Sequence, residues 1–111
     1  MSVNLADQAC EPCRGQTDPM DADGCATYLA QLDGWSVVDG HHLVKSYAFP
    51  DFVTALAFTN AVGALAEEVG HHPDILLRWG QVEITLWTHS IDGLHPADFI
   101  LAAKMDRIQR G

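Results

Sequence analysis

The sequence predicts an α+β fold: a four-stranded antiparallel sheet with three helices on one face, in the order α-β-β-α-β-β-α. Two pairs of short alternating segments flank the turn signals Asp39-Gly40 and Trp79-Gly80-Gln81, so each pair indicates a β-hairpin. A long apolar segment with helical spacing separates the hairpins, and shorter helical segments precede and follow them. Hairpins interleaved with helices imply an antiparallel sheet that the helices cover on one face.

The composition is that of one folded domain. With 111 residues, 48% hydrophobic and 19% charged, the chain is long enough for a single modest core. No apolar run approaches the length needed to cross a bilayer, and the start of the chain lacks the features of a secretory signal. We therefore expect a cytoplasmic protein. A net charge of −9 disfavours nucleic acid and anionic membranes as partners.

Residues 1–20 are expected to form an N-terminal extension, and residues 21–111 the folded domain, because the first segment has prolines and polar residues without periodicity. The extension contains Cys10 and Cys13, which have the spacing of half a zinc site. No second CxxC follows, so a zinc site would need Cys25 or other residues recruited by folding. The alternative is an arm without a metal.

A short helix and the first hairpin are expected between residues 21 and 48. Asp21 or Asp23 suits the helix N-cap, and Asp33-Gly34 is a stop signal. The first strand is expected over 35–38. After the turn, apolar and polar side chains alternate in a second strand that ends before Pro50-Asp51.

The longest helix is expected from Asp51, as N-cap, to about Val69, with Gly70 as the residue that ends it. Its apolar residues extend well beyond one stripe. A helix this apolar in a small domain predicts two buried faces, one on the sheet and one on another subunit. We therefore expect self-association through this helix, as a dimer or a tetramer.

The second hairpin and the last helix complete the predicted fold. Strands are expected over 75–79 and 82–88, and in the latter Val82, Ile84 and Leu86 share one face. The last helix is expected to start near Pro96, whose fixed φ suits the first helical position. Asp98 then falls at the third position, where a carboxylate meets free backbone N–H groups.

Three histidines are expected to converge at one rim of the sheet. His71 and His72 occupy the corner between the long helix and the second hairpin. His89 follows the far end of the hairpin's second strand, and a hairpin brings the end of one strand beside the start of the other. The sequence therefore predicts three imidazoles around one pocket.

Histidine clusters of this kind suit proton transfer, because imidazole supplies both acid and base forms near neutral pH. The nearby carboxylate of Glu67 is placed to fix one ring. Two alternatives stay open. Three histidines are also the ligand set of a catalytic zinc, although no HExxH motif is present. In the second alternative, the histidines are surface or packed residues that have no chemical role.

The same segment resembles the pterin-4a-carbinolamine dehydratases, also called 4a-hydroxytetrahydrobiopterin dehydratases. The family signature joins an acidic residue, His-His-Pro, an aromatic residue, a further His and an Asp, and all stand here at the family's spacing: Glu67, His71-His72-Pro73, Trp79, His89 and Asp98. The resemblance extends from about residue 35 to residue 108. It departs at His95, where relatives often carry Ser or Thr as an N-cap, which affects capping rather than catalysis.

The resemblance implies a dehydratase that converts a 4a-hydroxytetrahydropterin to quinonoid dihydropterin and water, and so regenerates the cofactor of aromatic amino acid hydroxylases. By matching positions, His71, His72 and His89 are the catalytic acid–base residues. The matches further imply a set of residues at the substrate: Pro73, Thr88, Glu67, Trp79 and Asp98. No metal and no redox cofactor are implied.

The resemblance also implies a non-enzymatic alternative. Members of the family serve as dimerisation cofactors of a homeodomain transcription factor, and related proteins assist assembly of the carbon-fixing carboxylase. A protein with only such a role is free to lose the imidazoles, whereas this chain has all three. A metal-dependent hydrolase that uses the same histidines is the third possibility.

Overall fold

The computed structural model describes residues 5–7 and 18–110. Its main elements follow the expected order α-β-β-α-β-β-α, which confirms the predicted fold class. They are α1 (Ala22–Leu29), β1 (Ser36–Val38), β2 (His42–Ala48), α2 (Phe52–Val69), β3 (Asp74–Arg78), β4 (Gln81–Leu86) and α3 (Pro96–Arg110). Two short 3-10 helices, η1 (Leu5–Asp7) and η2 (His89–Ile91), complete the described part of the chain.

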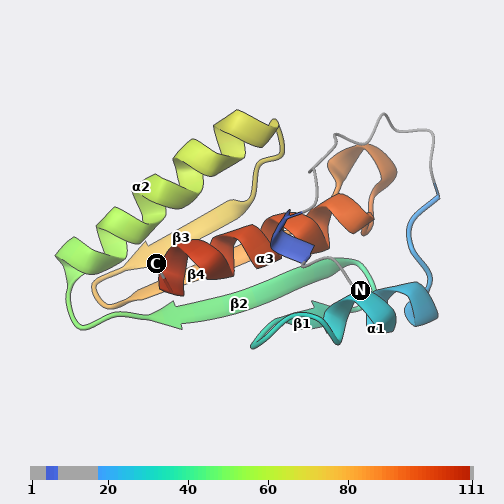
Figure 1. Cartoon of the computed structure of the whole chain (residues 1–111), viewed down its shortest axis with the longest axis horizontal. Coiled ribbons are helices and arrows are strands. Elements are labelled where there is room, and N and C mark those ends of the chain that lie inside the picture. The colour runs from blue at the N-terminus through green and yellow to red at the C-terminus, as the bar shows by residue number, and fades with distance from the viewer. Residues whose placement is uncertain (1–4, 8–17, 111) are drawn as a thin grey trace.

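The four strands form one antiparallel sheet in the order β1-β2-β4-β3. Helices α2 and α3 lie side by side over one face of this sheet, and α1 packs next to β1 (Figure 1). The β1–β2 turn has positive φ at both Asp39 and Gly40, 55° and 65°, as a type I′ hairpin turn requires. The sheet is therefore built from two hairpins joined through β2 and β4.

The core lies between the sheet and the two long helices. In β4 the side chains of Val82, Ile84 and Leu86 are fully buried and alternate with half-buried residues that face away from the helices. They pack in one cluster with Phe99 and Leu101 of α3. Complete burial of such a side chain contributes about 1.5–3 kcal/mol, so the strand's alternation fixes which of its faces meets the helices.

Several boundaries differ from the sequence prediction. Helix α1 ends at Leu29 rather than at Asp33-Gly34, and tighter turns follow, in which Gln31 N–H and Leu32 N–H donate to carbonyls three residues back. Strand β4 ends at Leu86 rather than at Thr88. The reason is that Thr88 pairs with Gly93 across a short loop instead of continuing the ladder.

Helix α2 has the predicted caps. The Asp51 carboxylate accepts the N–H of Thr54 at 2.9 Å, and Gly70 ends the helix with a φ of 71°. The helix buries only four residues against the domain, Ala55, Phe58, Val62 and Ala66. By length and composition, with a mean hydropathy of 1.2, it also reaches the minimum for a membrane span, contrary to the expectation from the sequence. Its contact with the sheet makes it an element of the folded domain.

The described part of the N-terminal extension packs on α3. Leu5 and Ala6 are buried, and Lys104 Nζ donates to the Ala6 carbonyl at 2.8 Å. Cys10 and Cys13 lie outside the described residues. Cys25 is buried in α1; burial raises the pKa of its thiol, and the negative charges of nearby carboxylates act in the same direction. The thiolate that zinc requires is therefore disfavoured at Cys25.

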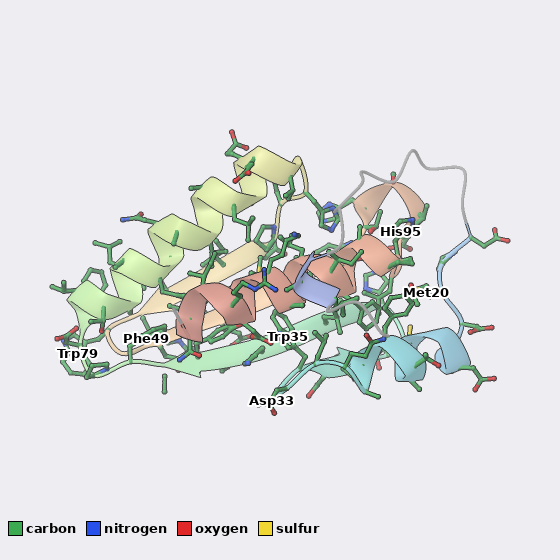
Figure 2. The ribbon with its side chains drawn as sticks, in the orientation of Figure 1. Met20, Asp33, Trp35, Phe49, Trp79 and His95 are labelled. Atoms are coloured by element: carbon green, nitrogen blue, oxygen red, sulfur yellow. The ribbon has the colours of Figure 1, made fainter. Side chains whose placement is uncertain are left out.

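A buried carboxylate joins the first hairpin to α3. Asp106 accepts hydrogen bonds from Trp35 Nε1 through both oxygens at 3.1 Å, from Lys45 Nζ at 2.8 Å and from Tyr47 Oη at 2.5 Å. Trp35 lies against α3 in Figure 2. Because the Lys45 side chain is itself mostly buried, the carboxylate neutralises a charge that has little access to solvent.

We predict that Asp106→Ala lowers the free energy of unfolding by about 3–5 kcal/mol, because it removes the carboxylate that accepts hydrogen bonds from Trp35 and Tyr47 and that neutralises the mostly buried Lys45 ammonium. Urea unfolding followed by circular dichroism measures the change. Asp23→Ala, at an exposed position in the first turn of α1, is the control and should lie within about 0.5 kcal/mol of wild type. Equal effects of the two substitutions would contradict the assigned role of Asp106.

Candidate active site

A pocket of about 230 Å³ opens where α2, β3 and the end of β4 meet. Its lining is Gly70, His71, His72, Trp87, Thr88, His89 and Ser90. The hairpin register places Asp74 opposite Thr85, so the start of β3 lies beside the end of β4. The structure thus brings together three histidines from separate parts of the chain, as the hairpin argument predicts.

His71 is held from behind by the buried carboxylate of Asp98. Its Nε2 lies 2.5 Å from Asp98 Oδ1, and its side chain is only 11% exposed. The other carboxylate oxygen accepts Thr88 Oγ1 at 2.8 Å and the His95 backbone N–H at 3.0 Å. Asp98 therefore joins the His-His-Pro corner, the end of β4 and the start of α3.

The Asp98 contact fixes which nitrogen of His71 is available for chemistry. A carboxylate only accepts hydrogen bonds, so the proton on this contact belongs to His71 Nε2. Nδ1 is then left to accept a proton when the ring is neutral and to donate one when the ring is an imidazolium. The contact therefore fixes the orientation of the ring through Nε2.

His72 forms a matching but exposed pair. Its Nε2 hydrogen-bonds the carboxylate of Glu67, one turn back in α2, and the two side chains are 60% and 79% exposed. A pair this exposed contributes little to stability. It still leaves His72 Nδ1 as the unpaired ring nitrogen, as at His71. Glu67 therefore orients a histidine as well as ending a helix.

His89 enters the pocket from a short loop whose ends are tied together. Thr88 is buried, its N–H donates to the Gly93 carbonyl at 2.8 Å, and its hydroxyl donates to Asp98. The His89 ring lies flat against the indole of Trp87, with ring centroids 4.2 Å apart and planes 12° from parallel. His89 is thus held by its backbone on one side and by an aromatic face on the other.

Not every residue expected at the substrate lies at this pocket. Pro73 follows the histidines but does not line it, and Asp98 and Glu67 stand behind the histidines they hold. Trp79 is 68% exposed at the β3–β4 turn, and Figure 2 shows it at the opposite end of the molecule from His95. The length of the hairpin separates Trp79 from the pocket, because its turn and its open end cannot coincide.

Three lining residues were not expected from the sequence: Gly70, Trp87 and Ser90. Trp87 and His89 are two residues apart, and in an extended strand such residues share one face. The sequence therefore contained a signal that Trp87 lies beside His89. At His95, Nδ1 accepts the Ala97 N–H at 3.0 Å while Asp98 accepts the His95 N–H, so this imidazole replaces the usual hydroxyl cap. The expectation of a capping role for His95 is confirmed.

A metal would need donors that converge on one point. Within residues 5–7 and 18–110, no group of three or more His, Cys, Asp or Glu side chains is arranged to hold a metal ion. The Nε2 atoms of His71 and His72 are directed to carboxylates instead. The described site is a hollow of about 230 Å³ lined by three imidazoles, two of which hydrogen-bond carboxylates.

This fold and pocket define a small α+β domain with a histidine-lined site. The model of the family described as pterin 4 alpha carbinolamine dehydratase matches residues 18–108. Two proteins provisionally named pterin-4-alpha-carbinolamine dehydratases are similar over nearly the whole length. That of Alkaliphilus metalliredigens is 50% identical over 96% of this chain and 96% of its own. That of Rubrobacter xylanophilus is 51% identical over 94% and 97%.

Two solved structures share the fold. A protein of Brucella melitensis described as a transcriptional coactivator/pterin dehydratase has a TM-score of 0.78 and 35% identity, covering 82% of this chain and 98% of that one. A pterin dehydratase-like protein described as a RuBisCO assembly factor of the alpha-carboxysome has a TM-score of 0.60 and 31% identity, covering 68% and 89%. The chain belongs to the pterin-4-alpha-carbinolamine dehydratase family.

The Asp98 contact predicts a difference between the two adjacent histidines. The His71 Nε2–H should give a resonance in ¹H–¹⁵N spectra near neutral pH, because burial and a charged acceptor slow its exchange with water. His72, which is mostly exposed, should give none. Asp98→Asn should abolish the His71 resonance. Its persistence in that variant, or its absence from wild type, would contradict the assigned contact.

Proposed function

We propose that this protein dehydrates a 4a-hydroxytetrahydropterin to quinonoid dihydropterin and so recycles the pterin cofactor of aromatic amino acid hydroxylases. One observation carries the proposal: imidazoles from three separate positions, His71, His72 and His89, line one pocket. Family membership supports the same reaction class. A cytoplasmic location, with no nucleic acid or membrane partner, belongs to this proposal.

The chemistry needs one proton donor and one acceptor on the same heterocycle. An imidazolium protonates the 4a-hydroxyl, the carbon–oxygen bond breaks as electrons move in from a ring nitrogen, and water leaves. A neutral imidazole then takes up a ring N–H proton, so the two histidines exchange protonation states and the substrate keeps its charge. General acid–base catalysis of this kind contributes about 10²–10⁴-fold. Neither a metal nor a redox cofactor enters these steps.

The site is suited to these steps because its rings are fixed while a nitrogen of each stays free. Asp98 and Glu67 each bind the Nε2 of one histidine, which leaves Nδ1 for the substrate. Preorganised groups of this kind lower the barrier because they need no reorientation during the reaction. Both carboxylates are accordingly proposed as positioning residues.

Dehydration of freshly generated 4a-hydroxytetrahydropterin, with and without a chelator, tests this function. We expect the double variant His72→Ala, His89→Ala to lower the catalysed rate at least about 10²-fold. Asp23→Asn, at an exposed position on α1, is the control and should retain full activity. A wild-type rate no faster than that of the double variant would refute the enzyme. Activity lost on chelation and restored by zinc would favour a metal hydrolase instead.

A non-enzymatic assembly role is the second candidate, favoured by the similarity to a RuBisCO assembly factor. The two roles make different demands on the pocket. An assembly surface does not need three imidazoles around one hollow, whereas the dehydratase does. The double histidine variant separates the roles, since it should lose catalysis while keeping its association state.

Self-association through α2 is a further part of the proposal. The side of the helix turned away from the sheet exposes Phe52, Val53 and Leu56, with Val53 74% exposed. Exposed apolar residues grouped on one helix are typical of a protein–protein interface. The same face carries Ala57 and Ala64, whose small side chains permit close approach of a second helix.

We predict that Leu56→Glu converts the assembled protein to a smaller species, because it places a charge in the proposed interface. Size-exclusion chromatography with light scattering measures the mass. Leu76→Glu is the matched control, since Leu76 is equally apolar and exposed but lies on β3. If Leu76→Glu dissociates the protein and Leu56→Glu does not, the interface is on the sheet and the proposal is wrong.

A further inference from the structure

A second group of rings lies next to the candidate active site and has no part in the mechanism above. We call it the support cluster: His41, His42, Trp87 and Asp92. His41 and His42 follow the β1–β2 turn, Trp87 follows β4, and Asp92 ends the loop that begins at His89. Only Trp87 reaches the pocket lining. The cluster therefore adjoins the site without filling it.

Trp87 sets the plane of the His89 ring. The two rings are nearly parallel, 12° apart, with centroids at 4.2 Å. The χ2 angle, which sets the plane of a histidine ring, has a broad distribution when nothing restricts it. A histidine at a pocket wall therefore rotates unless a neighbouring side chain holds its ring. A flat aromatic contact supplies that restriction, because stacked rings attract each other beyond the effect of the area they bury.

His41 and His42 hold Trp87 from the β1–β2 side. Their ring centroids lie 5.6 Å and 6.2 Å from that of the indole, with tilted planes. The two imidazoles are also bonded to each other, Nδ1 to Nδ1, at 3.1 Å. The indole thus contacts both the His89 ring and a pair of linked imidazoles, and these contacts limit its movement.

His41 also holds the loop that carries His89. Its Nε2 donates to Asp92 Oδ1 at 2.8 Å, a contact between residues 51 positions apart. Asp92 has a φ of 50°, a strained value for a residue other than glycine, and its N–H donates to the His89 carbonyl at 3.2 Å. The Asp92 side chain is 89% exposed, so the bond adds little to overall stability and serves as a local link between the β1–β2 hairpin and the loop of His89.

We propose that Trp87 and the His41–Asp92 pair are positioning residues for His89, which hold its ring and its loop in the geometry that proton transfer requires. This inference rests on the proposed dehydratase function. A displacement of a catalytic group by about 1 Å can lower a rate by about 10²-fold, so a modest loosening of His89 is measurable. The effect should fall mainly on kcat, since Trp87 is the only member of the cluster that lines the pocket and its indole is stacked on the His89 ring.

Trp87→Leu tests the stack, because leucine keeps the position apolar without an aromatic face. We expect kcat for carbinolamine dehydration to fall at least about tenfold with KM within about threefold of wild type. Trp87→Phe, which restores an aromatic face, should recover kcat to within about threefold. Unchanged kcat in Trp87→Leu, or an equal loss in Trp87→Phe, would overturn the positioning role.

His41→Gln and Asp92→Asn test the loop contact. As members of one pair they should lower kcat by similar factors, and the double variant should be no worse than either single one. Asn tolerates the positive φ at position 92, so the backbone is not changed as well. Asp23→Asn is the matched control on α1. Multiplicative losses in the double variant would overturn the coupling.

A readout independent of activity separates failure of this inference from failure of the proposed function. The ring current of the indole should shift the His89 Hε1 resonance upfield, and Trp87→Leu should remove that shift while Trp87→Phe keeps part of it. A protein with the ring-current shift but no dehydratase activity would refute the proposed function and leave the stack in place. Equal His89 shifts in wild type and Trp87→Leu would refute the stack itself.

Discussion

The candidate site depends on one buried carboxylate. Asp98 has no exposed surface, and its oxygens accept hydrogen bonds from His71, from the Thr88 hydroxyl and from the backbone of His95. A charge buried this deeply is tolerated only because every such bond is made. The carboxylate therefore requires the His-His-Pro corner, the end of β4 and the start of α3 to meet at one place. His71 lines the pocket, whereas Asp98, which holds its ring, does not.

The three histidines, to which the proposed dehydration assigns one proton transfer, are held in different ways. His71 is fixed from the interior by a carboxylate, His72 from the surface by Glu67, and His89 by an aromatic face and a closed loop. In this arrangement the fold supplies orientation, and solvent has access from the exposed side at His72. The same fold occurs in one relative described as a RuBisCO assembly factor and in another described as a transcriptional coactivator/pterin dehydratase, so the fold alone does not decide the function.

Sequence patterns predicted the fold and the histidine pocket because both follow from local rules. Alternation gave β4, Asp51 and Gly70 gave the ends of α2, and the second hairpin brought His89 to the same pocket as His71. Long-range polar contacts have no such pattern: the hydrogen bonds of Asp106 to the first hairpin, and of Asp92 to His41, join residues more than 50 positions apart. Trp79 is a residue that the motif includes but that does not lie at the pocket. A motif records spacing along the chain, whereas the hairpin places this residue far from the pocket in space.

The central claim is that three imidazoles share one flat heterocycle, and ligand titration followed by NMR tests it most directly. The six histidines of the chain give six Hε1 resonances, which single substitutions assign. On addition of a 7,8-dihydropterin, the resonances of His71, His72 and His89 should shift together with a single dissociation constant, while that of His95 moves least. Shifts that follow different dissociation constants, or that spare His89, would show that the three rings do not form one binding site.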